Sequence, residues 1–473
     1  MFYKVIKNYL YNASYQIFIL LVPLITTPYL ARVLGPTGVG INSYTNSVIQ
    51  YFILFGSIGV NLYGNRQIAF VRDDSKELSK TFYEVFFMRI ITVCISLLAF
   101  QVFLLIVNEY KTYYLAQSVS IIAAAFDISW FFMGIENFAV TVIRNLIVKI
   151  ITLISIFIFV KSYDDLTAYI LILSLSLLIG NLTLFPSLHK YVKMPKITSL
   201  NIWRHLIPSL VLFVPQIATQ VYLVLNKTML GAMISVQSSG YFDQSDKIIK
   251  MVLAIVTATG TVMLPHVANA FAKGNHAKTK EYLYNSFSFV STIAIPMMFG
   301  LMAVSSKFVP LFFTAKFSEV IPIMVIESIV IILIAWSNVI GTQYLLPTNQ
   351  TKQYTISVII GALVNLVINV PLIFLWGAMG ASYATVLSEL TVTLYQLVVI
   401  RNQVKYKMLF KDTSKYVISG LVMYVVIYSL DRILKMNWLD LVIEVLLGIF
   451  IYIFLLIIFK ADILNKLRNF MKK

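Results

Sequence analysis

Four ionisable side chains fall on one face of a predicted membrane helix. They lie three and four residues apart within the apolar stretch 240–264: Asp243, Asp246, Lys247 and Lys250. Residues with this spacing are neighbours on a helix, and charges inside a bilayer are costly unless they face a cavity or a partner. Either Asp243–Lys247 and Asp246–Lys250 pair along the helix, or the side chains line a hydrophilic cavity. Lys250 lies about 15 Å into the stretch, near the midplane.

The stretch 40–63 carries a matching polar stripe without charge. Positions 200 residues before the charged face hold hydroxyl and amide side chains: Ser43, Asn46, Ser47 and Gln50. A helix that faces lipid does not keep such a stripe, because buried polar groups need partners. The two stripes therefore predict a hydrophilic cavity lined by residues 40–63 and 240–264.

Other ionisable residues also fall within or at the ends of apolar stretches. Arg32 and Lys227 end the stretches 9–31 and 206–226, and Arg89 lies inside 83–106. These cations either face the cavity or anchor the helices at the interface, where a long side chain can reach water. Each acid is a candidate proton or sodium site, or a partner for a cation: Asp127, Glu327, Glu389 and Glu444.

The stretches that end at Arg32 and Lys227 each contain two prolines. They are Pro23, Pro28, Pro208 and Pro215. Proline interrupts the backbone hydrogen bonds of a helix and allows it to bend. A static kink is common in membrane helices, but paired kinks beside paired cations favour a gating hinge.

The composition limits which elements can hold these side chains. The chain has 473 residues, of which 59% are apolar and 12% charged, and its mean hydropathy is +0.85. Soluble proteins have about 25% charged residues. The composition therefore excludes a soluble enzyme, a disordered protein and a disulfide scaffold, and it predicts an all-α polytopic membrane protein, because isolated helices satisfy their own backbone in lipid.

About fourteen apolar stretches are predicted to span the bilayer. They are 9–31, 40–63, 83–106, 114–133, 141–160, 166–185, 206–226, 240–264, 283–305, 320–343, 355–375, 378–400, 416–434 and 439–459. If both termini are cytoplasmic, 25 of the 37 Lys and Arg residues lie in inside connections and 7 in outside ones. This bias sets the orientation, and it accounts for the net charge of +17 without a nucleic-acid partner.

Two connections recur at an offset of about 200 residues. Arg32-Val-Leu-Gly35 with Gly40 matches Lys227-Thr-Met-Leu-Gly231 with Gly240, and Ala69-Phe-Val-Arg72 matches Ala270-Phe-Ala-Lys273. Six stretches per repeat predict two six-helix lobes, 1–200 and 201–405, in the same orientation, with two helices and a basic cytoplasmic tail in 406–473. Transporters built from such parallel repeats bind substrate between the lobes.

The chain offers little for catalysis or for a cofactor. Cys94 is the only cysteine, and the four histidines lie in polar connections, where solvated side chains are expected. No P-loop motif occurs, and Gly35–Gly40 is interpreted as a tight turn. We therefore expect no catalytic residue, no metal and no cofactor.

The chain resembles the Wzx-like polysaccharide flippases of the multidrug/oligosaccharidyl-lipid/polysaccharide exporter superfamily. The resemblance rests on Pro28-Tyr-Leu-Ala-Arg-Val-Leu-Gly35, Trp130-Phe-Phe-Met-Gly-Ile-Glu136 with Arg144–Lys149, Lys227–Gly231 with Gly240, Leu346-Pro347 with Lys352, Gly361 and Asn365, and Gly377–Ala381. It implies a two-lobed fold with a cationic cavity in a bacterial plasma membrane. It also implies that a polyprenyl-diphosphate-linked oligosaccharide moves from the inner to the outer leaflet.

The resemblance gives the polar residues expected roles. Arg32, Arg89, Lys227 and Lys250 become candidate phosphate ligands, because cations supply charge-assisted bonds to phosphate. Side chains of the two stripes become candidates for binding the glycan: Ser43, Asn46, Ser47, Gln50, Asp243, Asp246 and Lys247. Asp127, Glu327 and Glu389 remain candidates for ion coupling. Glycosyltransferases and a polysaccharide polymerase are the expected partner enzymes.

Three other functions stay open. A drug–cation antiporter of the same superfamily would favour acids over bases in its cavity. A peptidoglycan-precursor flippase would share the same features. A membrane glycosyltransferase or polymerase would need acidic residues in a sizeable external loop, whereas the external loop Arg32–Gly40 holds no acid.

Overall fold

The computed structural model describes the backbone of residues 2–464. The side chains of residues 2–21, 138, 214–216, 218–219, 222–223, 259 and 261–262 lie outside the described part. The described backbone contains no strand. Ten of its helices are long and apolar enough to cross a membrane, and two of these have 50 residues, enough for two crossings each. The expected all-α membrane fold is confirmed, and the helices are compatible with fourteen crossings.

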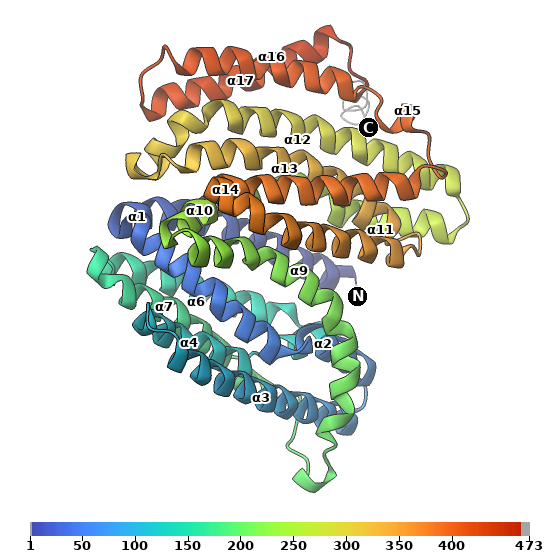
Figure 1. Cartoon of the computed structure of the whole chain (residues 1–473). Helices are drawn as coiled ribbons and strands as arrows, with labels where there is room; N and C mark the ends of the chain where they lie inside the picture. Colours follow the sequence, from blue (N-terminus) through green and yellow to red (C-terminus); the bar gives the residue numbers. More distant parts are fainter. Residues whose placement is uncertain (1, 465–473) are drawn as a thin grey trace. The chain divides into compact units, whose positions relative to one another are not determined.

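The chain divides into two compact units, Met1–Gly231 and Ala232–Lys473. The predicted lobes 1–200 and 201–405 remain a prediction. The first unit holds α1 (Phe2–Ser57), α2 (Val60–Val71), α3 (Ser75–Ile106), α4 (Lys111–Ala125), α5 (Ser129–Gly134), α6 (Phe138–Phe159), η1 (Tyr163–Asp165), α7 (Leu166–Leu182), α8 (Phe185–Leu188), η2 (Ile197–Ser199), η3 (Ile202–His205) and most of α9 (Leu206–Met233). Within it, α4 packs against α1, α3 and α7 (Figure 1).

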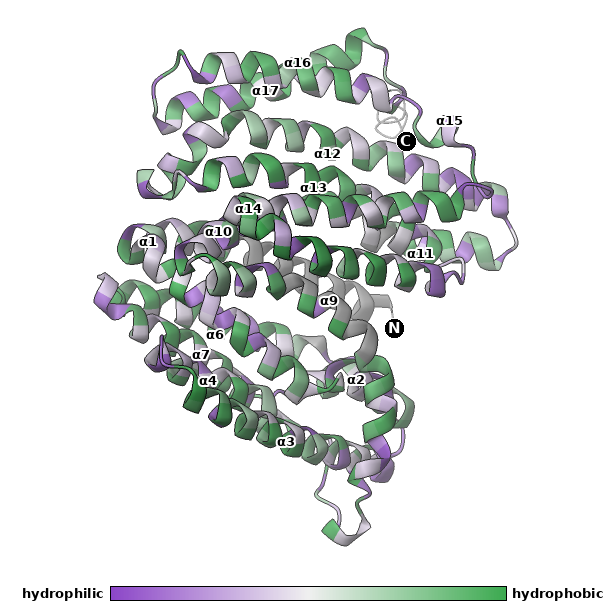
Figure 2. Cartoon of the chain, viewed as in Figure 1, coloured by the Kyte–Doolittle hydropathy of each residue, from purple (hydrophilic) through white to green (hydrophobic). Residues whose placement is uncertain are grey.

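The second unit has its core around α12 and α13. It holds α10 (Val236–Thr257), α11 (Thr259–Ala272), α12 (His276–Phe312), η4 (Ala315–Phe317), α13 (Val320–Ile340), η5 (Gly341–Leu345), α14 (Thr351–Ile400), α15 (Tyr406–Leu409), α16 (Thr413–Asp431) and α17 (Trp438–Ile458). The helices α16 and α17 pack on each other and on α12. Figure 2 shows hydrophobic residues along α3, α16 and α17, with hydrophilic residues gathered in the connections.

Glycine breaks each of the two longest helices. Gly35 in α1 has φ 65 and ψ −177, and Gly377 in α14 has φ 54 and ψ −130. This backbone region is essentially restricted to glycine. The tight turn expected at Gly35–Gly40 is therefore a single glycine kink, from which Pro36 continues the helix. The predicted boundaries between 9–31 and 40–63, and between 355–375 and 378–400, fall at these kinks.

An aromatic pair recurs in the two units. Phe82 of α3 stacks on Trp130 of α5, with ring centroids 5.6 Å apart and planes at 22°. Phe287 of α12 stacks on Trp336 of α13, at 5.3 Å and 23°. The second pair follows the first by 205 and 206 residues (287 − 82 and 336 − 130), close to the offset of the sequence repeat. The two units therefore share a packing scheme as well as a sequence pattern.

A polar contact recurs with the stacked rings. Asn181 of α7 donates to the carbonyl oxygen of Ala123 in α4 at 2.7 Å. Thr393 of α14 donates to the carbonyl oxygen of Leu333 in α13 at 3.0 Å. In each unit the sixth predicted crossing thus bonds to the backbone of the fourth, which fixes the helices that surround the polar residues described next.

Candidate functional site

A polar cavity of about 250 Å³ lies inside the N-terminal unit. The half of α1 that follows Gly35 contributes Asn42, Asn46 and Gln50 to its wall. The other lining residues come from α4, α6 and α7: Gln117, Ser120, Val148, Lys149, Thr152, Ile170, Leu173, Ser174, Ser176 and Leu177. Hydroxyl and amide groups therefore line a cavity within a bundle of apolar helices.

A second cavity in the same unit, of about 210 Å³, lies between α1, the start of α2, and α9. It is lined by Gln50, Ile53, Leu54, Ser57, Gly59, Asn61, Gln220 and Val224. Gln50 borders both cavities, and its Nε2 donates to Asn46 Oδ1 at 3.3 Å. The predicted stripe thus supplies Asn46 and Gln50 to cavity walls.

The other two members of the stripe are buried and line neither cavity. Ser43 and Ser47 each pack inside the unit. Ser47 donates to the carbonyl oxygen of Tyr44 at 2.7 Å and accepts from Thr228 of α9 at 2.8 Å. Ser47 therefore joins α1 to α9 through Thr228, the residue that follows Lys227 in the chain.

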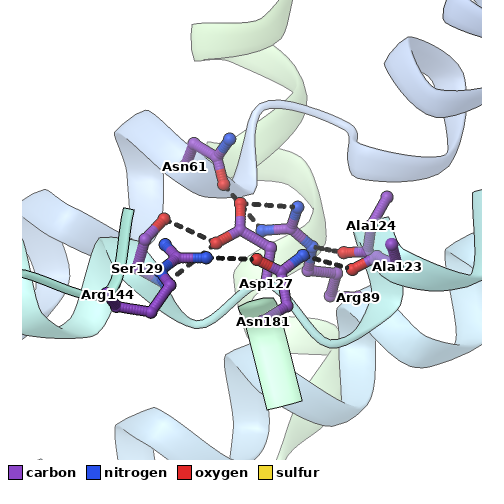
Figure 3. Close-up of polar contacts among 8 residues, drawn as sticks. All are labelled: Asn61, Arg89, Ala123, Ala124, Asp127, Ser129, Arg144 and Asn181. Atoms are coloured by element: carbon purple, nitrogen blue, oxygen red, sulfur yellow. Dashed lines mark hydrogen bonds and ion pairs between the residues drawn. The ribbon is translucent and has the colours of Figure 1, made fainter. Parts of the chain in front are cut away.

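Arg89 lies at the centre of a buried polar cluster (Figure 3). The residue is 1% exposed. Its Nε donates to the carbonyl oxygen of Ala124 and its Nη1 to Asn61 Oδ1, both at 2.6 Å, while its Nη2 lies 3.5 Å from Asp127 Oδ2. Arg89 does not extend to the interface, so the snorkelling alternative is wrong.

Asp127 holds this cluster together from the end of α4. Its Oδ1 accepts hydrogen bonds from the backbone and hydroxyl of Ser129, at 3.0 and 2.5 Å. Beside it, Arg144 of α6 donates to Asn181 Oδ1 at 2.9 Å (Figure 3). Because Asn61 also borders the second cavity, Arg89 lies directly behind a cavity wall.

The charged face of α10 forms ion pairs within the helix. Lys247 Nζ lies 2.5 Å from Asp243 Oδ2, and Lys250 Nζ lies 2.7 Å from Asp246 Oδ2. The predicted intrahelical pairing is therefore confirmed. The two lysine side chains are 40% and 47% exposed, whereas their acids are largely covered. The stripe presents ammonium groups over a row of buried carboxylates.

The remaining candidates are dispersed within their own units. Arg32 is exposed and its Nη1 donates to the carbonyl oxygen of Pro28 at 2.8 Å. Lys227 and Glu389 are half-buried. Glu327 of α13 is buried and accepts a hydrogen bond from Ser245 of α10. Of the hinge candidates, Pro23 and Pro28 lie inside α1 and Pro208 inside α9; the Pro215 side chain lies outside the described residues.

The sequence did not reveal a second buried network, around Glu84 of α3. Glu84 accepts from the backbone of Asn201 at 2.7 Å and pairs with Arg204 at 2.6 Å and His205 at 2.8 Å. The Nδ1 of His205 in turn lies 2.6 Å from Tyr63 Oη. His205 is 4% exposed, so the expectation that it is solvated is wrong.

A third buried network lies in the C-terminal unit. Lys307 of α12, 2% exposed, pairs with Glu444 of α17 and lies 3.5 Å from Asp431 of α16. Ser306 donates to Asp431 at 2.7 Å. The network ties the last two helices to α12. Glu444 was identified from the sequence as a buried acid, whereas its partner Lys307 lies just beyond the predicted stretch 283–305.

Known proteins resemble this chain in sequence and in fold. The putative O-antigen transporter of Escherichia coli (strain K12) is 25% identical over 401 residues, which cover 84% of this chain and 96% of that protein. The lipid II flippase MurJ in its inward closed conformation has a TM-score of 0.79 at 19% identity, covering 96% of this chain and 100% of that one. An inward-facing multidrug resistance MATE family transporter of the MOP superfamily has a TM-score of 0.64 at 13% identity, with coverages of 81% and 94%.

The structural similarities confirm the expected superfamily fold. A family model described as polysaccharide biosynthesis protein matches residues 5–271. That match covers more than half of the chain and includes both cavities and the Arg89 cluster. The chain belongs to the polysaccharide biosynthesis protein family.

Proposed function

We propose that this protein is a flippase that moves a polyprenyl-diphosphate-linked oligosaccharide from the cytoplasmic to the outer leaflet by alternating access. The translocated repeat unit would serve the synthesis of a capsule, O-antigen or exopolysaccharide. The observation that carries the proposal is a set of amide- and hydroxyl-lined cavities inside a membrane bundle that belongs to the polysaccharide biosynthesis family. The relative named as a putative O-antigen transporter supports it.

Three cations outside the Arg89 cluster are suited to the diphosphate. An ion moved into hydrocarbon without partners loses tens of kcal/mol of solvation in the Born limit. Arg32, Lys227 and Lys250 can replace that solvation with charge-assisted bonds, and an arginine can grip two phosphate oxygens at once. Arg89 would first have to release Asn61 and Asp127. We therefore assign Arg89 to the framework of the N-terminal unit and the first three cations to the phosphates.

Neutral polar residues are suited to the sugars. Asn46 and Gln50 border the cavities of the N-terminal unit. Sugar hydroxyls both donate and accept hydrogen bonds, as amide and hydroxyl side chains do. On α10, the pairs Asp243–Lys247 and Asp246–Lys250 offer both kinds of group without a large net charge. The polyprenyl chain would stay in lipid.

The membrane potential can drive export. An inside-negative potential contributes about 2.3 kcal/mol per charge per 100 mV, so two negative charges moving outward gain about 4–5 kcal/mol. A coupled ion is a further possibility within the proposal. Its candidate sites are Asp127, which is paired with Arg89, together with Glu327 and Glu389.

The alternative functions fit the charges less well. An antiporter for cationic drugs would expose carboxylates, whereas α10 covers its carboxylates and exposes its lysines. The similar protein from Escherichia coli is named as a putative O-antigen transporter, which supports a transport protein over a glycosyltransferase. We place the protein in a bacterial plasma membrane with both termini cytoplasmic, working beside glycosyltransferases and a polymerase.

Export of surface polysaccharide tests the proposal. In cells that lack the chromosomal copy, a variant carrying Arg32→Ala and Lys227→Ala should leave about a hundredfold less polysaccharide on the surface, because each of the two lost charge-assisted bonds weakens binding by about tenfold. Lipid-linked repeat units should accumulate inside. Arg432→Ala removes an exposed cation that contacts Tyr428 and serves as the matched control. Normal export by the double variant at normal membrane levels would refute the phosphate assignment.

A further inference from the structure

Lys149 is a cation at mid-membrane depth. It is the twelfth of the 22 residues of α6, so about 15 Å of helix separates it from either end. A lysine at a helix end reaches water by extending its side chain along the helix, but at this depth the interface is too far. Lys149 is exposed in the structure, and it borders the larger cavity of the N-terminal unit, which supplies a polar environment.

Lys149 has no acidic partner among the described ion pairs. The lysines of α10 pair with Asp243 and Asp246, and Lys307 pairs with Glu444. Among the described residues that line the cavity beside Lys149, none carries a carboxylate. Lys149 thus presents a positive charge at the cavity without an acidic partner among the described ion pairs, and such a charge attracts an anion.

Neutral hydrogen-bonding groups surround this charge. Gln117 of α4 is 4% exposed; its Nε2 donates to Asn42 Oδ1 at 3.3 Å, while its Oε1 is buried without a hydrogen-bond partner. On the opposite wall, Thr152 donates to Ser176 at 2.7 Å. Buried polar atoms are rarely left unpartnered. A turn of the side chain would let this covered acceptor of Gln117 bind a ligand with hydroxyl donors.

The size of the cavity limits that ligand to a single ring. Pockets for drug-sized ligands measure about 300–1,000 Å³, and this cavity measures about 250 Å³. A diphosphate would be better served by several cations, and above all by arginine. One ammonium group among amides and hydroxyls suits a group with one negative charge and several hydroxyls.

We propose that the cavity between α1, α4, α6 and α7 binds one anionic monosaccharide of the transported repeat unit, with Lys149 bound to its carboxylate. Gln117, Asn46 and Gln50 bind the ring hydroxyls. This inference rests on the proposed flippase function and makes the N-terminal unit the part that selects the glycan. The cations assigned to the diphosphate then bind a group that all polyprenyl-diphosphate-linked repeat units share.

Reconstituted protein with two matched substrates tests the inference. Vesicles receive a polyprenyl-diphosphate disaccharide that ends in either a uronic acid or the corresponding neutral hexose, and translocation is followed by enzymatic labelling of the opposite leaflet. Lys149→Met should reduce translocation of the acidic glycan by about tenfold, the value of one charge-assisted bond, and leave the neutral glycan within a factor of two or so. Lys149→Arg should translocate the acidic glycan about as well as the unaltered protein does.

The control removes a charge from the end of the same helix. Lys161→Met lies two residues beyond α6, where Lys161 donates to the carbonyl oxygen of Phe157, and it should affect neither substrate. Equal loss of both glycans in Lys149→Met, or no loss of either, overturns the sugar assignment while leaving the flippase intact. If the unaltered protein moves neither glycan, the proposed function itself fails.

Discussion

The two units use one packing scheme but place their buried charges differently. The offset that relates the stacked pairs Phe82–Trp130 and Phe287–Trp336 puts Ala294 and Leu333 where the N-terminal unit has Arg89 and Asp127. Both replacements are buried. The corresponding positions thus hold an ion pair with polar neighbours in one unit and two buried apolar residues of the hydrophobic core in the other.

The first stripe shows the opposite pattern. In the N-terminal unit α1 carries the neutral residues Asn46 and Gln50, whereas α10 carries Asp246 and Lys250 at the corresponding positions. These two sets of charges lie where compensation is available: from Asn61, Ser129 and a backbone carbonyl around Arg89–Asp127, and from within the helix on α10. The repeat therefore preserves how the helices pack, whereas the positions of the charged residues differ between the two units.

The largest effect is expected from breaking the pair found only in the N-terminal unit. Asp127→Ala leaves the guanidinium of Arg89 buried without its carboxylate, and removing one partner of a buried pair costs about 3–5 kcal/mol of unfolding free energy. Arg89→Met combined with Asp127→Leu imitates the apolar site of the C-terminal unit and should recover at least half of the loss. Unfolding in detergent measures the free energy of unfolding of the single and of the double variant. A double variant as unstable as Asp127→Ala would show that the cluster has a role beyond ion pairing.

The glycine kinks should respond alike in the two units. Gly35→Ala and Gly377→Ala each force an unfavourable backbone conformation that costs about 1–3 kcal/mol, although neither new methyl group would meet an atom closer than 4.0 Å. Gly300→Ala in the regular helix α12 is the control and should be neutral or stabilising, because alanine favours helix. Thermal unfolding of the three variants separates backbone strain from steric contact. If neither Gly35→Ala nor Gly377→Ala lowered the stability, the strain argument would be contradicted.

A smaller difference should separate the two stacked tryptophans. The Nε1 of Trp336 donates to Ser291 Oγ at 2.9 Å, whereas the Nε1 of Trp130 has no hydrogen-bond partner. Trp336→Phe should therefore cost about 1 kcal/mol more than Trp130→Phe, the net value of one hydrogen bond. Equal losses in chemical unfolding would mean that ring packing alone sets the stability of both sites.

The smallest effect concerns the connection between α6 and α7. Backbone hydrogen bonds from Lys161 and Ser162 lower the pKa of Asp165, so the carboxylate stabilises the fold above the ordinary pKa and loses that effect as the pH falls through the lowered one. Asp165→Asn should be slightly less stable at neutral pH, and the difference should shrink as the pH falls below the ordinary aspartate pKa of about 3.9. The Gly377 kink, at the corresponding place in the C-terminal unit, has no such carboxylate among its described residues. The stability loss caused by Gly377→Ala should therefore not shrink as the pH falls.

Much of this architecture could be predicted from local sequence. The apolar stretches, the breaks at Gly35 and Gly377 and the pairs on α10 all depend on residues fewer than five positions apart or on helix length. The network of Glu84 with His205 could not be predicted from local sequence. These two residues are 121 positions apart and meet only when the connection after α8 folds back on α3. Arg89 and Asp127 were both identified, but their pairing depends on how α3 packs against α4.

Translocation in vesicles tests the central claim most directly. Purified protein is reconstituted with a polyprenyl-diphosphate-linked oligosaccharide in one leaflet, and a lectin outside reports its arrival in the other. The flippase account predicts that the glycan crosses far faster than in empty vesicles, and faster still with a potential that favours outward movement of the diphosphate. A glycan that stays in its leaflet, beside cationic drugs that are expelled against an ion gradient, would contradict it.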